Sequence, residues 1–496
     1  MRLLPGVAAL LVPALALRAQ EAPAAPGPAT RPESAPRTAV LDLVPADDPF
    51  AAVVRDALRV AQAPAAIRCA RPAEALARLR AEAPRFALVV VRPQDLDVNL
   101  AYDLLDVFAR IDDDPFVDVA YGVVTGRDAA AARAFLARSD AVRREPSRIP
   151  RASLEVMGPN QMDDTAARFW GRPIALPRLA GWRQQSLNHG RRGYPDTRLA
   201  ELQGYGLVHL GGHGVPERIE QGLTAAQVRR LDWSDAIVWS GACWTGVVGP
   251  WVEYRAGRVE RRTCAEPFAL EVLENGAAAY LAALHPDHGI PVYQEIEHVL
   301  ATGATLGEAL ECTYDALVLH AGGRRPELPR WREGAPPPPS GRGNVEFQGT
   351  AARILFGDPR IRPCAALVPA SFSVRSERDG KVLRITATLR HTELRNGLSD
   401  TFAGDLASDP MLFNERMALK VPLAPGDPGQ RITVERARSG PGLLRRSRDL
   451  PSRVVGHAVE EEDGRRFLHV QVDFPAAGFQ ESEFRRAGTQ VVLRVE

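Results

Sequence analysis

Two short apolar runs between residues 207 and 243 constrain the fold of this chain more than any other feature. The first run, Leu207–Leu210, leads through two glycines into His213, and the second, Ala236–Trp239, leads through Ser-Gly-Ala into Cys243. Runs of about four to eight apolar residues, rich in β-branched and aromatic types, are typical of buried strands in a parallel sheet. Residues 224–231 begin with an N-cap threonine and have helical spacing. We therefore predict a strand, a helix and a second strand.

The two reactive residues are expected at one edge of the sheet, because the loops that follow neighbouring parallel strands lie at the same edge. A cysteine thiolate is a nucleophile, and an imidazole beside it stabilises the thiolate and protonates a leaving amine. Gly214 lets a substrate backbone approach and leaves its N–H group free for an oxyanion. Taken singly, Cys243 is ordinarily a small buried hydrophobe and His213 a turn residue. The ordered pair favours a catalytic function.

The pair of motifs His213-Gly214 and Ala242-Cys243 resembles the caspase-like cysteine peptidases of clan CD. These peptidases carry a His-Gly after one hydrophobic block and an Ala-Cys after the next. Within that group, the chain is similar to the gingipain-like peptidases over about residues 40–365. Three further stretches carry the resemblance: a helix, Gly-Ala turn and strand at 267–282, a helix start at 303–310, and the Gly-Asp-Pro of 357–359.

The resemblance implies a caspase-like fold in which helices flank a mainly parallel sheet. It also implies peptide-bond hydrolysis through an acyl-enzyme on Cys243, with His213 as acid and base. The N–H groups of Gly214 and Cys243 would then donate to the oxyanion, and cleavage after Arg or Lys is the implied preference. The family pattern includes an acid before an early strand. Asp118 is the candidate for that acid and would orient His213, and a solvated turn is the alternative for it.

Three further residues are candidates for a substrate pocket. Asp163 and Asp164 open a predicted helix and suit a basic side chain, although acids at a helix start ordinarily interact with the helix dipole. Trp244 follows the candidate nucleophile and is either a pocket wall or part of the core. His209 lies four residues before His213, but the Gly-Gly between them argues against a helical metal site. We expect no metal or cofactor; the sequence does not decide whether a structural calcium ion is bound.

The chain divides by pattern into a catalytic part, residues 38–366, and a C-terminal part, residues 367–496. Apolar strand runs alternate with helical spacing over 38–148, which indicates an α/β fold. Residues 149–366 carry both reactive residues, and 181–190 are expected as a loop. After residue 367 the apolar residues recur at every second position between Gly and Pro turns. This pattern predicts an antiparallel β-sandwich, immunoglobulin-like in kind.

The first residues are predicted to be a targeting segment. Residues 1–19 combine Arg2, an apolar run and small residues, as a secretory signal peptide does, and residues 20–37 are an Ala/Pro-rich linker. A disordered apolar tail is the alternative. The run is too short to span a bilayer, so we expect no transmembrane segment after signal removal. The chain is therefore expected to be exported to the periplasm or the extracellular space.

Composition bears mainly on partners. The 496 residues have a net charge of +1, and no basic stretch is interleaved with aromatic residues, so no nucleic acid is expected. The five cysteines show no Cys-x-x-Cys, which indicates neither a disulfide framework nor a thiolate metal site. The expected partner is a protein or peptide substrate. Two functions stand: an exported cysteine endopeptidase, or a catalytically silent caspase-like fold that serves as a binding or scaffold protein of the cell envelope.

Overall fold

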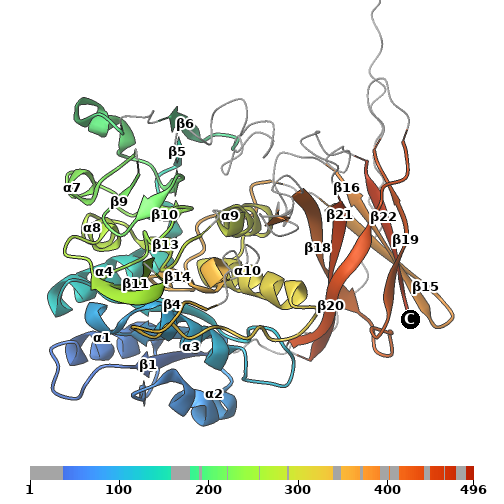
Figure 1. The fold of residues 1–496 in the computed structure, drawn as a ribbon, viewed down its shortest axis with the longest axis horizontal. Helices are drawn as coiled ribbons and strands as arrows, with labels where there is room; N and C mark the ends of the chain where they lie inside the picture. The colour runs from blue at the N-terminus through green and yellow to red at the C-terminus, as the bar shows by residue number, and fades with distance from the viewer. Residues whose placement is uncertain are drawn as a thin grey trace, which may run out of the picture. The chain divides into compact units, whose positions relative to one another are not determined.

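The computed structural model describes the chain in segments. They are residues 37–157, 179–188, 193–220, 222–255, 257–287, 290–338, 348–368, 372–390, 401–402, 413–440, 447–462, 464–475 and 488–496. The predicted signal peptide lies outside these residues, as do residues 20–36 of the predicted linker. Asp163 and Asp164 also lie outside them. Figure 1 shows the chain coloured along its length.

A ten-stranded sheet organises the described residues up to Phe356 (Figure 1). Its strands follow the order β2-β1-β3-β4-β14-β13-β10-β7-β5-β6. Their bounds are β1 (Thr38–Asp42), β2 (Ile67–Arg68), β3 (Phe86–Val90), β4 (Ala120–Val124), β5 (Ala152–Met157), β6 (Arg183–Asn188), β7 (Leu207–Leu210), β10 (Ile237–Ser240), β13 (Ala279–Ala283) and β14 (Arg353–Phe356). The sheet is mostly parallel, and β14 runs antiparallel to β13. The predicted α/β class is therefore confirmed.

Helices cover both faces of this sheet. On one face, α1 (Ala51–Ala61) and α4 (Ala129–Arg144) pack against Val40 and Leu88. On the other face, α3 (Val98–Phe108) packs with the alternate residues of the same strands. Because both faces are covered, β1, β3, β4 and β13 are buried along their whole length.

The remaining helical elements differ in length, from single turns to helices of 13 and 15 residues. Their bounds are α2 (Leu76–Glu82), α7 (Ala225–Val228), α8 (Phe268–Glu274), α9 (Ile290–Thr302), α10 (Leu306–His320), and the 3-10 turns η1 (Pro72–Ala75), η2 (Pro93–Asp95), η3 (Pro146–Arg148) and η4 (Asp196–Leu202). A capping box of Thr305 and Glu308 begins α10, at the helix start predicted from the resemblance. A second capping box, at Thr224, begins α7, which is a single turn and shorter than predicted.

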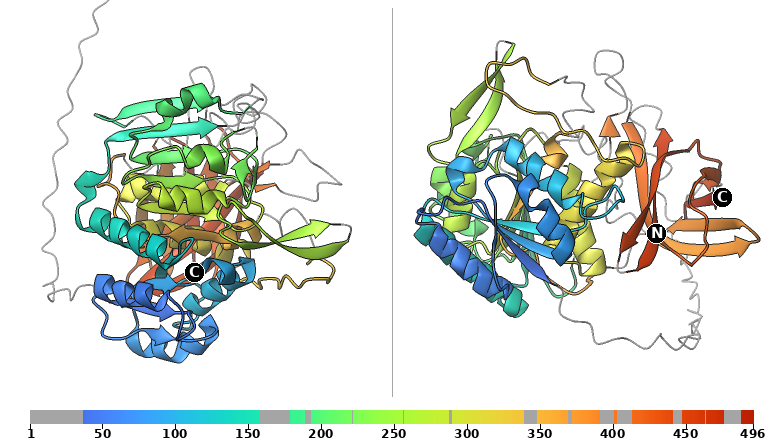
Figure 2. Two further views of the ribbon diagram at one scale, coloured as in Figure 1. Left: turned by 90° about the vertical axis from the view of Figure 1, so that its left-hand side faces the viewer. Right: turned by 90° about the horizontal axis from the view of Figure 1, so that it is seen from below.

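Two predictions about local structure were wrong or incomplete. Residues 183–188, expected within a loop, form edge strand β6, which pairs in parallel with β5. This strand has few apolar residues to mark it, because its outer side has no neighbour in the sheet. A hairpin of β11 (Pro250–Arg255) and β12 (Arg258–Thr263) was not predicted, although its alternation and Gly257 are typical of one. Figure 2 shows this hairpin projecting from the helices and strands around it. A smaller hairpin joins β8 (Gly214–Val215) and β9 (Arg218–Ile219).

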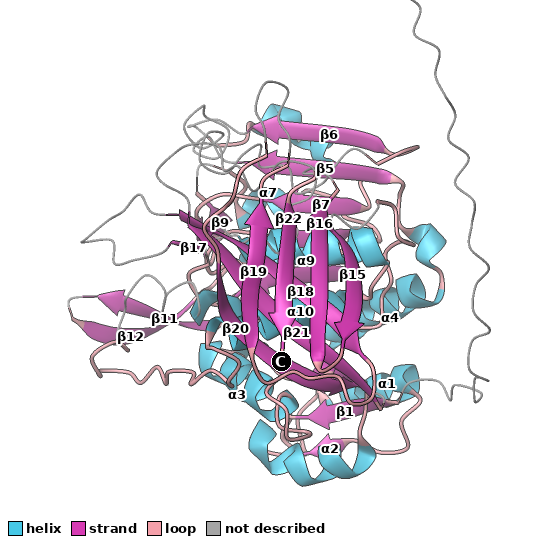
Figure 3. Cartoon of the chain, turned by 90° about the vertical axis from the view of Figure 1, so that its right-hand side faces the viewer, coloured by secondary structure: helices cyan, strands magenta, loops and turns pink. Residues whose placement is uncertain are grey.

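The C-terminal part is built from two four-stranded antiparallel sheets (Figure 3). The strands are β15 (Phe372–Asp379), β16 (Val382–Leu389), β17 (Thr401–Phe402), β18 (Phe413–Leu423), β19 (Ile432–Arg438), β20 (Arg453–Glu462), β21 (Arg465–Pro475) and β22 (Gln490–Val495). Ile385, Met417 and Leu468, from both sheets, share one apolar core, so the predicted β-sandwich is confirmed. Strand β20 escaped prediction because Gly456 and a bulge interrupt its alternation.

Two further expectations concern the domain boundary and membrane-spanning helices. The predicted boundary at residues 366 and 367 falls between the end of β14 and the start of β15, and it stays a prediction. In the part of the chain that the structure describes, no helix is both long and apolar enough to cross a membrane.

Candidate active site

The two candidate catalytic residues follow neighbouring strands of the main sheet. Strand β7 pairs in parallel with β10, with Val208 opposite Val238 and Leu210 opposite Ser240. His213 and Cys243 each lie three residues beyond these strand ends. The structure therefore brings the two loops to the same edge of one parallel sheet, as the two apolar runs predicted.

The two loops touch at Gly214. A Cβ atom on this residue would lie 2.3 Å from the Cys243 carbonyl oxygen and 3.0 Å from the Cys243 nitrogen, which leaves no room for a side chain. Gly212, two residues earlier, has a φ of 147° that side-chain-bearing residues rarely adopt. The glycines around His213 thus have a structural reason: they let the main chain of one loop lie directly against the other.

The Cys243 thiol lies among main-chain groups. Its Sγ–H donates to the Asp287 carbonyl at 3.1 Å, and the Asp287 N–H donates to Sγ at 3.3 Å. Burial raises the pKa of the thiol to about 11, and the negative charge of Asp287 adds to the rise. The N–H groups of Asp287, Cys243 and Gly214 act on the sulfur in the opposite sense and lower its pKa. The Asp287 N–H is thus hydrogen-bonded to the sulfur, and the N–H groups of Cys243 and Gly214 favour its thiolate form.

The His213 side chain is exposed. Its carbonyl oxygen accepts from the Glu220 N–H at 2.7 Å, which fixes the main chain of the loop. Within the described segments, no hydrogen bond joins the imidazole to the Cys243 thiol. The thiol instead bonds to Asp287, so the predicted dyad is not hydrogen-bonded in this state.

A network of hydroxyl groups shapes the loop that carries Cys243. Thr245 Oγ1 lies 2.7 Å from Ser240 Oγ and donates to the Ala242 carbonyl at 2.8 Å. Ser240 Oγ accepts from the Ala242 N–H at 3.2 Å. Trp244 adopts the left-handed region with a φ of 55°, which is uncommon for a residue with a side chain. The network holds a tight turn that places the thiol just past the strand.

A buried arginine below the thiol was missed by sequence reasoning. The Arg353 guanidinium, fully buried on β14, forms ion pairs with Asp287 at 2.5 Å and Glu295 at 2.5 Å. It also donates to the Ser240 carbonyl at 3.1 Å. Burial alone would lower the pKa of Arg353, but the two carboxylates outweigh it and raise the pKa. In sequence, Arg353 is only the first residue of a short strand, and the polar pair Asp287 and Glu295 gives no motif that leads to it.

Trp244 belongs to an aromatic cluster beside the thiol. Its ring meets Trp251 edge to face with centroids 5.6 Å apart, and the His285 ring lies 6.4 Å from Trp244 and 4.6 Å from Trp331. Burial lowers the pKa of His285 to about 3, so this imidazole is neutral. Trp244 is partly buried and packs against the core. Its assignment to a substrate pocket stays a prediction.

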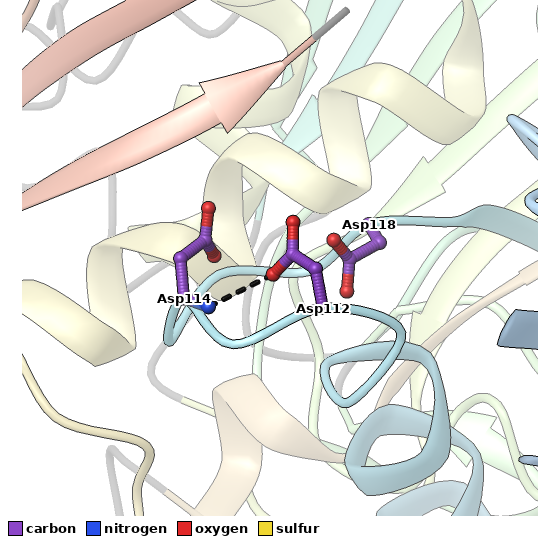
Figure 4. Close-up of side chains that lie close together, drawn as sticks. All are labelled: Asp112, Asp114 and Asp118. Atoms are coloured by element: carbon purple, nitrogen blue, oxygen red, sulfur yellow. Dashed lines mark hydrogen bonds between the residues drawn. The ribbon is translucent and has the colours of Figure 1, made fainter. Parts of the chain in front are cut away.

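Asp118 belongs to a different part of the molecule. Figure 4 shows it beside Asp112 and Asp114 on the loop that precedes β4. Asp118 accepts from the Ile111 N–H at 3.1 Å. Burial and the neighbouring Asp112 raise the pKa of Asp118 to about 8. Four steps in the sheet separate β4 from β7, or on the order of 19 Å at the usual strand spacing.

The edge of the sheet also separates Asp118 from His213. Asn99, which follows β3, exchanges hydrogen bonds of 2.9 Å with Trp331, whose ring packs on His285 after β13. The C-terminal end of β3 therefore faces the edge that carries Cys243. Because β3 and β4 are parallel, Asp118, which precedes β4, lies toward the other edge. The structure does not bring Asp118 to His213, so the geometry gives no support to the predicted orienting role.

Two arrangements bear on metal binding. The oxygens of Asp112, Asp114 and Asp118 lie within 4.8 Å of one another, which is close enough to hold a metal ion. His209 lies on strand β7, where its Nδ1 is 3.4 Å from Glu155 on the neighbouring strand. His209 and His213 are thus not on a helix, in agreement with the sequence reasoning.

Comparisons with known proteins give a likeness in fold alone. Neither the protein-family comparison nor the comparison with curated protein sequences finds a match. Among solved structures, the chain is similar to a protease at 12% identity and a TM-score of 0.43, covering 71% of this chain and 84% of the other. It is also similar to the Saccharomyces cerevisiae separase–securin complex at 12% identity and a TM-score of 0.33. That match covers 55% of this chain, which spans only 15% of the other chain.

Proposed function

We propose that this protein is an exported cysteine endopeptidase that hydrolyses peptide bonds through an acyl-enzyme on Cys243. One observation carries the proposal. The loops of His213 and Cys243 meet so closely that a Cβ atom on Gly214 would lie 3.0 Å from the Cys243 nitrogen, and the N–H groups of both residues lower the pKa of the sulfur. A buried structural cysteine would need no such set of donors, whereas an oxyanion formed next to the sulfur would accept from them.

The proposed reaction begins with attack of the Cys243 thiolate on the carbonyl carbon of a peptide bond. The carbonyl oxygen becomes an oxyanion and accepts from the N–H groups of Gly214 and Cys243. His213, as the imidazolium, protonates the leaving amine as the C–N bond breaks. Water then attacks the thioester, His213 takes its proton, and the acid product leaves with Cys243 restored as the thiol or thiolate.

His213 must turn toward the thiol for this reaction. Its imidazole is exposed, so rotation about its side-chain bonds has little packing to break. Catalytic hydrogen bonds are often long in free enzymes and shorten only when substrate binds. The proposal therefore assigns the imidazole to the substrate-bound state, in which a peptide lies between the two loops.

Labelling with an irreversible peptidyl probe that reacts with thiols tests the assignment of the nucleophile. Labelling should be lost in Cys243→Ala and kept in Cys69→Ala, because Cys69 is a buried free cysteine on the N-terminal half of the sheet. His213→Ala should label slowly and hydrolyse no peptide. Equal labelling of wild type and Cys243→Ala would defeat the proposal.

Gly214→Ala tests the oxyanion donors. The added methyl group would lie 2.3 Å from the Cys243 carbonyl oxygen and would push the Gly214 N–H away from the sulfur. Peptide hydrolysis should fall by roughly 100-fold or more, the usual cost of one lost oxyanion donor. Gly257→Ala is the control for backbone strain away from the site, since Gly257 has a φ of 83° between β11 and β12 and a methyl group there meets no atom within 4 Å. Its hydrolysis should stay near the wild-type rate. Unchanged hydrolysis in Gly214→Ala would remove this role.

Substrate preference belongs to the proposal as well. We propose cleavage after Arg or Lys, on the resemblance alone, since Asp163 and Asp164 lie outside the described residues. A peptide library profiled with the wild-type protein checks this, and a strong preference for an acidic or apolar residue would exclude it. The absence of any cleavage, together with tight binding of an envelope protein, would favour the silent binding or scaffold function instead.

A further inference from the structure

The segment His285–Asp287 covers the candidate nucleophile. Its last residue both accepts a hydrogen bond from the Cys243 thiol and donates one to it, at 3.1 and 3.3 Å. The carbonyl of His285, two residues earlier, accepts from the Trp244 N–H at 3.3 Å. The segment is therefore also hydrogen-bonded to the residue that follows the nucleophile. A carbonyl carbon must approach a thiolate to about 3–3.5 Å for attack. The Asp287 main chain already lies at that distance.

A buried arginine is paired with the carboxylate of this segment. Arg353 pairs with the Asp287 carboxylate through Nη1 and with Glu295 through two hydrogen bonds, from Nε at 2.5 Å and Nη2 at 2.8 Å. The three side chains are almost fully buried, with exposures of 0%, 1% and 0% for Arg353, Asp287 and Glu295. The same Nη1 donates to the Ser240 carbonyl, which ends the strand before Cys243. One guanidinium therefore joins the segment over the thiol to the strand below it.

We propose that Asp287 and Arg353 form a latch that keeps the segment His285–Asp287 over the Cys243 thiol. The site opens when the Asp287 carboxylate leaves Arg353. Asp287 is then a positioning residue, which acts on the thiol through the main chain that its side chain anchors. The inference rests on the proposed function, because a latch controls catalysis only if Cys243 is the nucleophile. Whether the segment covers the thiol can be tested without any peptide cleavage.

The two carboxylates on Arg353 have unequal parts in this latch. Glu295 lies on α9 and makes two hydrogen bonds, so it satisfies the guanidinium when Asp287 departs. This lowers the cost of opening, because the arginine is not left buried without a partner. Glu295 itself is not part of the segment His285–Asp287. Weakening Asp287 should therefore open the site, whereas weakening Glu295 should leave Asp287 as the remaining carboxylate on Arg353 and hold the site closed.

The two matched variants Asp287→Asn and Glu295→Gln test this difference. Each removes one buried negative charge next to the same arginine, and each keeps the size of the side chain. The measurement is the alkylation rate of Cys243 in the full-length protein, by iodoacetamide and by a bulky maleimide, followed by mass spectrometry across pH 6–10. We expect Asp287→Asn to react at least about tenfold faster at pH 7.5 and Glu295→Gln to react at the wild-type rate or slower.

The pair of reagents separates opening from a direct effect of charge. Asp287 is the charged group whose field acts on the thiol, so its neutralisation alone would raise both alkylation rates by one factor. Opening of the segment should raise the rate of the bulky reagent more than that of iodoacetamide. An equal factor for both reagents, a change of the same sign in both variants, or an unchanged rate in Asp287→Asn would each overturn the latch.

A second variant, Asp287→Glu, tests the latch if Asp287→Asn does not fold. This variant keeps the charge but lengthens the side chain by one methylene. If the ion pair with Arg353 still forms, the main chain of the segment must lie farther from the arginine. Faster alkylation with the same dependence on reagent size is expected, and no change would overturn the latch. Because alkylation reads the thiol directly, the latch can hold even if no peptide is cleaved, and the loss of one proposal is distinguishable from the loss of the other.

Discussion

Two groups of acids, one buried and one partly exposed, differ in whether a cation lies beside them. Below Cys243, Asp287 and Glu295 share Arg353, and the three side chains are almost fully buried. In the loop before β4, Asp118 lies beside Asp112 and Asp114, and the hydrogen bond to Asp118 comes from a main-chain N–H. In the first group, burial raises the pKa of Glu295 and the Arg353 cation acts against that rise, whereas in the second group burial and the neighbouring Asp112 both raise the pKa of Asp118.

The difference teaches that a raised pKa is not by itself a sign of a catalytic acid. Asp118 has a strongly raised pKa, which often marks functional sites, yet it lies toward the sheet edge away from His213. Asp287 touches the candidate nucleophile through its main chain, and its carboxylate points to an arginine. The place of an acid relative to the C-terminal strand ends therefore indicates its relation to Cys243 better than its pKa does.

The largest expected effect is the loss of the shared cation. Arg353→Met would leave the buried side chains of Asp287 and Glu295 without this cation and should lower the free energy of unfolding by about 3–5 kcal/mol. Denaturant unfolding measures this. Arg59→Met is the control, since Arg59 is 75% exposed in its pair with Asp56 and should change stability by less than about 1 kcal/mol. Adding Asp287→Asn and Glu295→Gln to Arg353→Met should restore part of the loss. A loss no larger than that of Arg59→Met would show that the acids are not held by this cation.

The same substitution should have opposite signs in the two groups. Asp287→Asn weakens an ion pair to a buried arginine and should destabilise the fold by about 1–3 kcal/mol. Asp118→Asn removes a carboxyl that the fold resists ionising, and at pH 8 it should stabilise the fold by on the order of 1 kcal/mol. Chemical unfolding of both variants at pH 8 checks the signs. Destabilisation by both would mean that the two groups do not differ in compensation.

The pH dependence of stability sharpens the contrast. The pKa of Asp118 is about 8 in the folded protein and near 4 when unfolded, so the folded state binds the extra proton between these values. Stability from this group is therefore full below about pH 4 and is lost as the pH rises toward 8. Asp118→Asn should unfold with a flatter pH profile over that window than wild type. An identical profile would assign the effect to other groups.

The smallest effect concerns the neutral hydroxyl network around Cys243. Thr245→Val removes the hydrogen bonds to Ser240 and the Ala242 carbonyl and should cost about 1 kcal/mol of stability. It should also slow alkylation or hydrolysis at Cys243, because the turn loses part of its support. Thr433→Val, at an exposed position on β19, is the control and should change neither. Equal effects of the two variants would mean that the hydroxyl network does not support the turn that carries Cys243.

The sequence predicted the strands that position the candidate site but not the buried ion pairs beside it. The apolar runs 207–210 and 236–239 predicted two neighbouring parallel strands, since burial on both faces requires continuous apolar residues. The edge strand β6 was missed because its polar residues carry no such pattern, and β20 was missed because a bulge breaks its period. Asp118 was matched to His213 through the family pattern of an acid before an early strand, and that pattern does not say at which edge of this sheet the residue lies.

By itself, the sequence determined the strands that carry His213 and Cys243, the glycine between their loops, and the change to an antiparallel module near residue 367. These features follow from local periodicity and steric demand, which neighbouring residues set. Only the tertiary structure decided that Arg353, Asp287 and Glu295 meet below the thiol. They come from a strand, a loop and a helix up to 66 positions apart, and an ion pair leaves no periodic trace in sequence. Charge pairing in a core depends on which elements pack together, and that is settled only when the chain has folded.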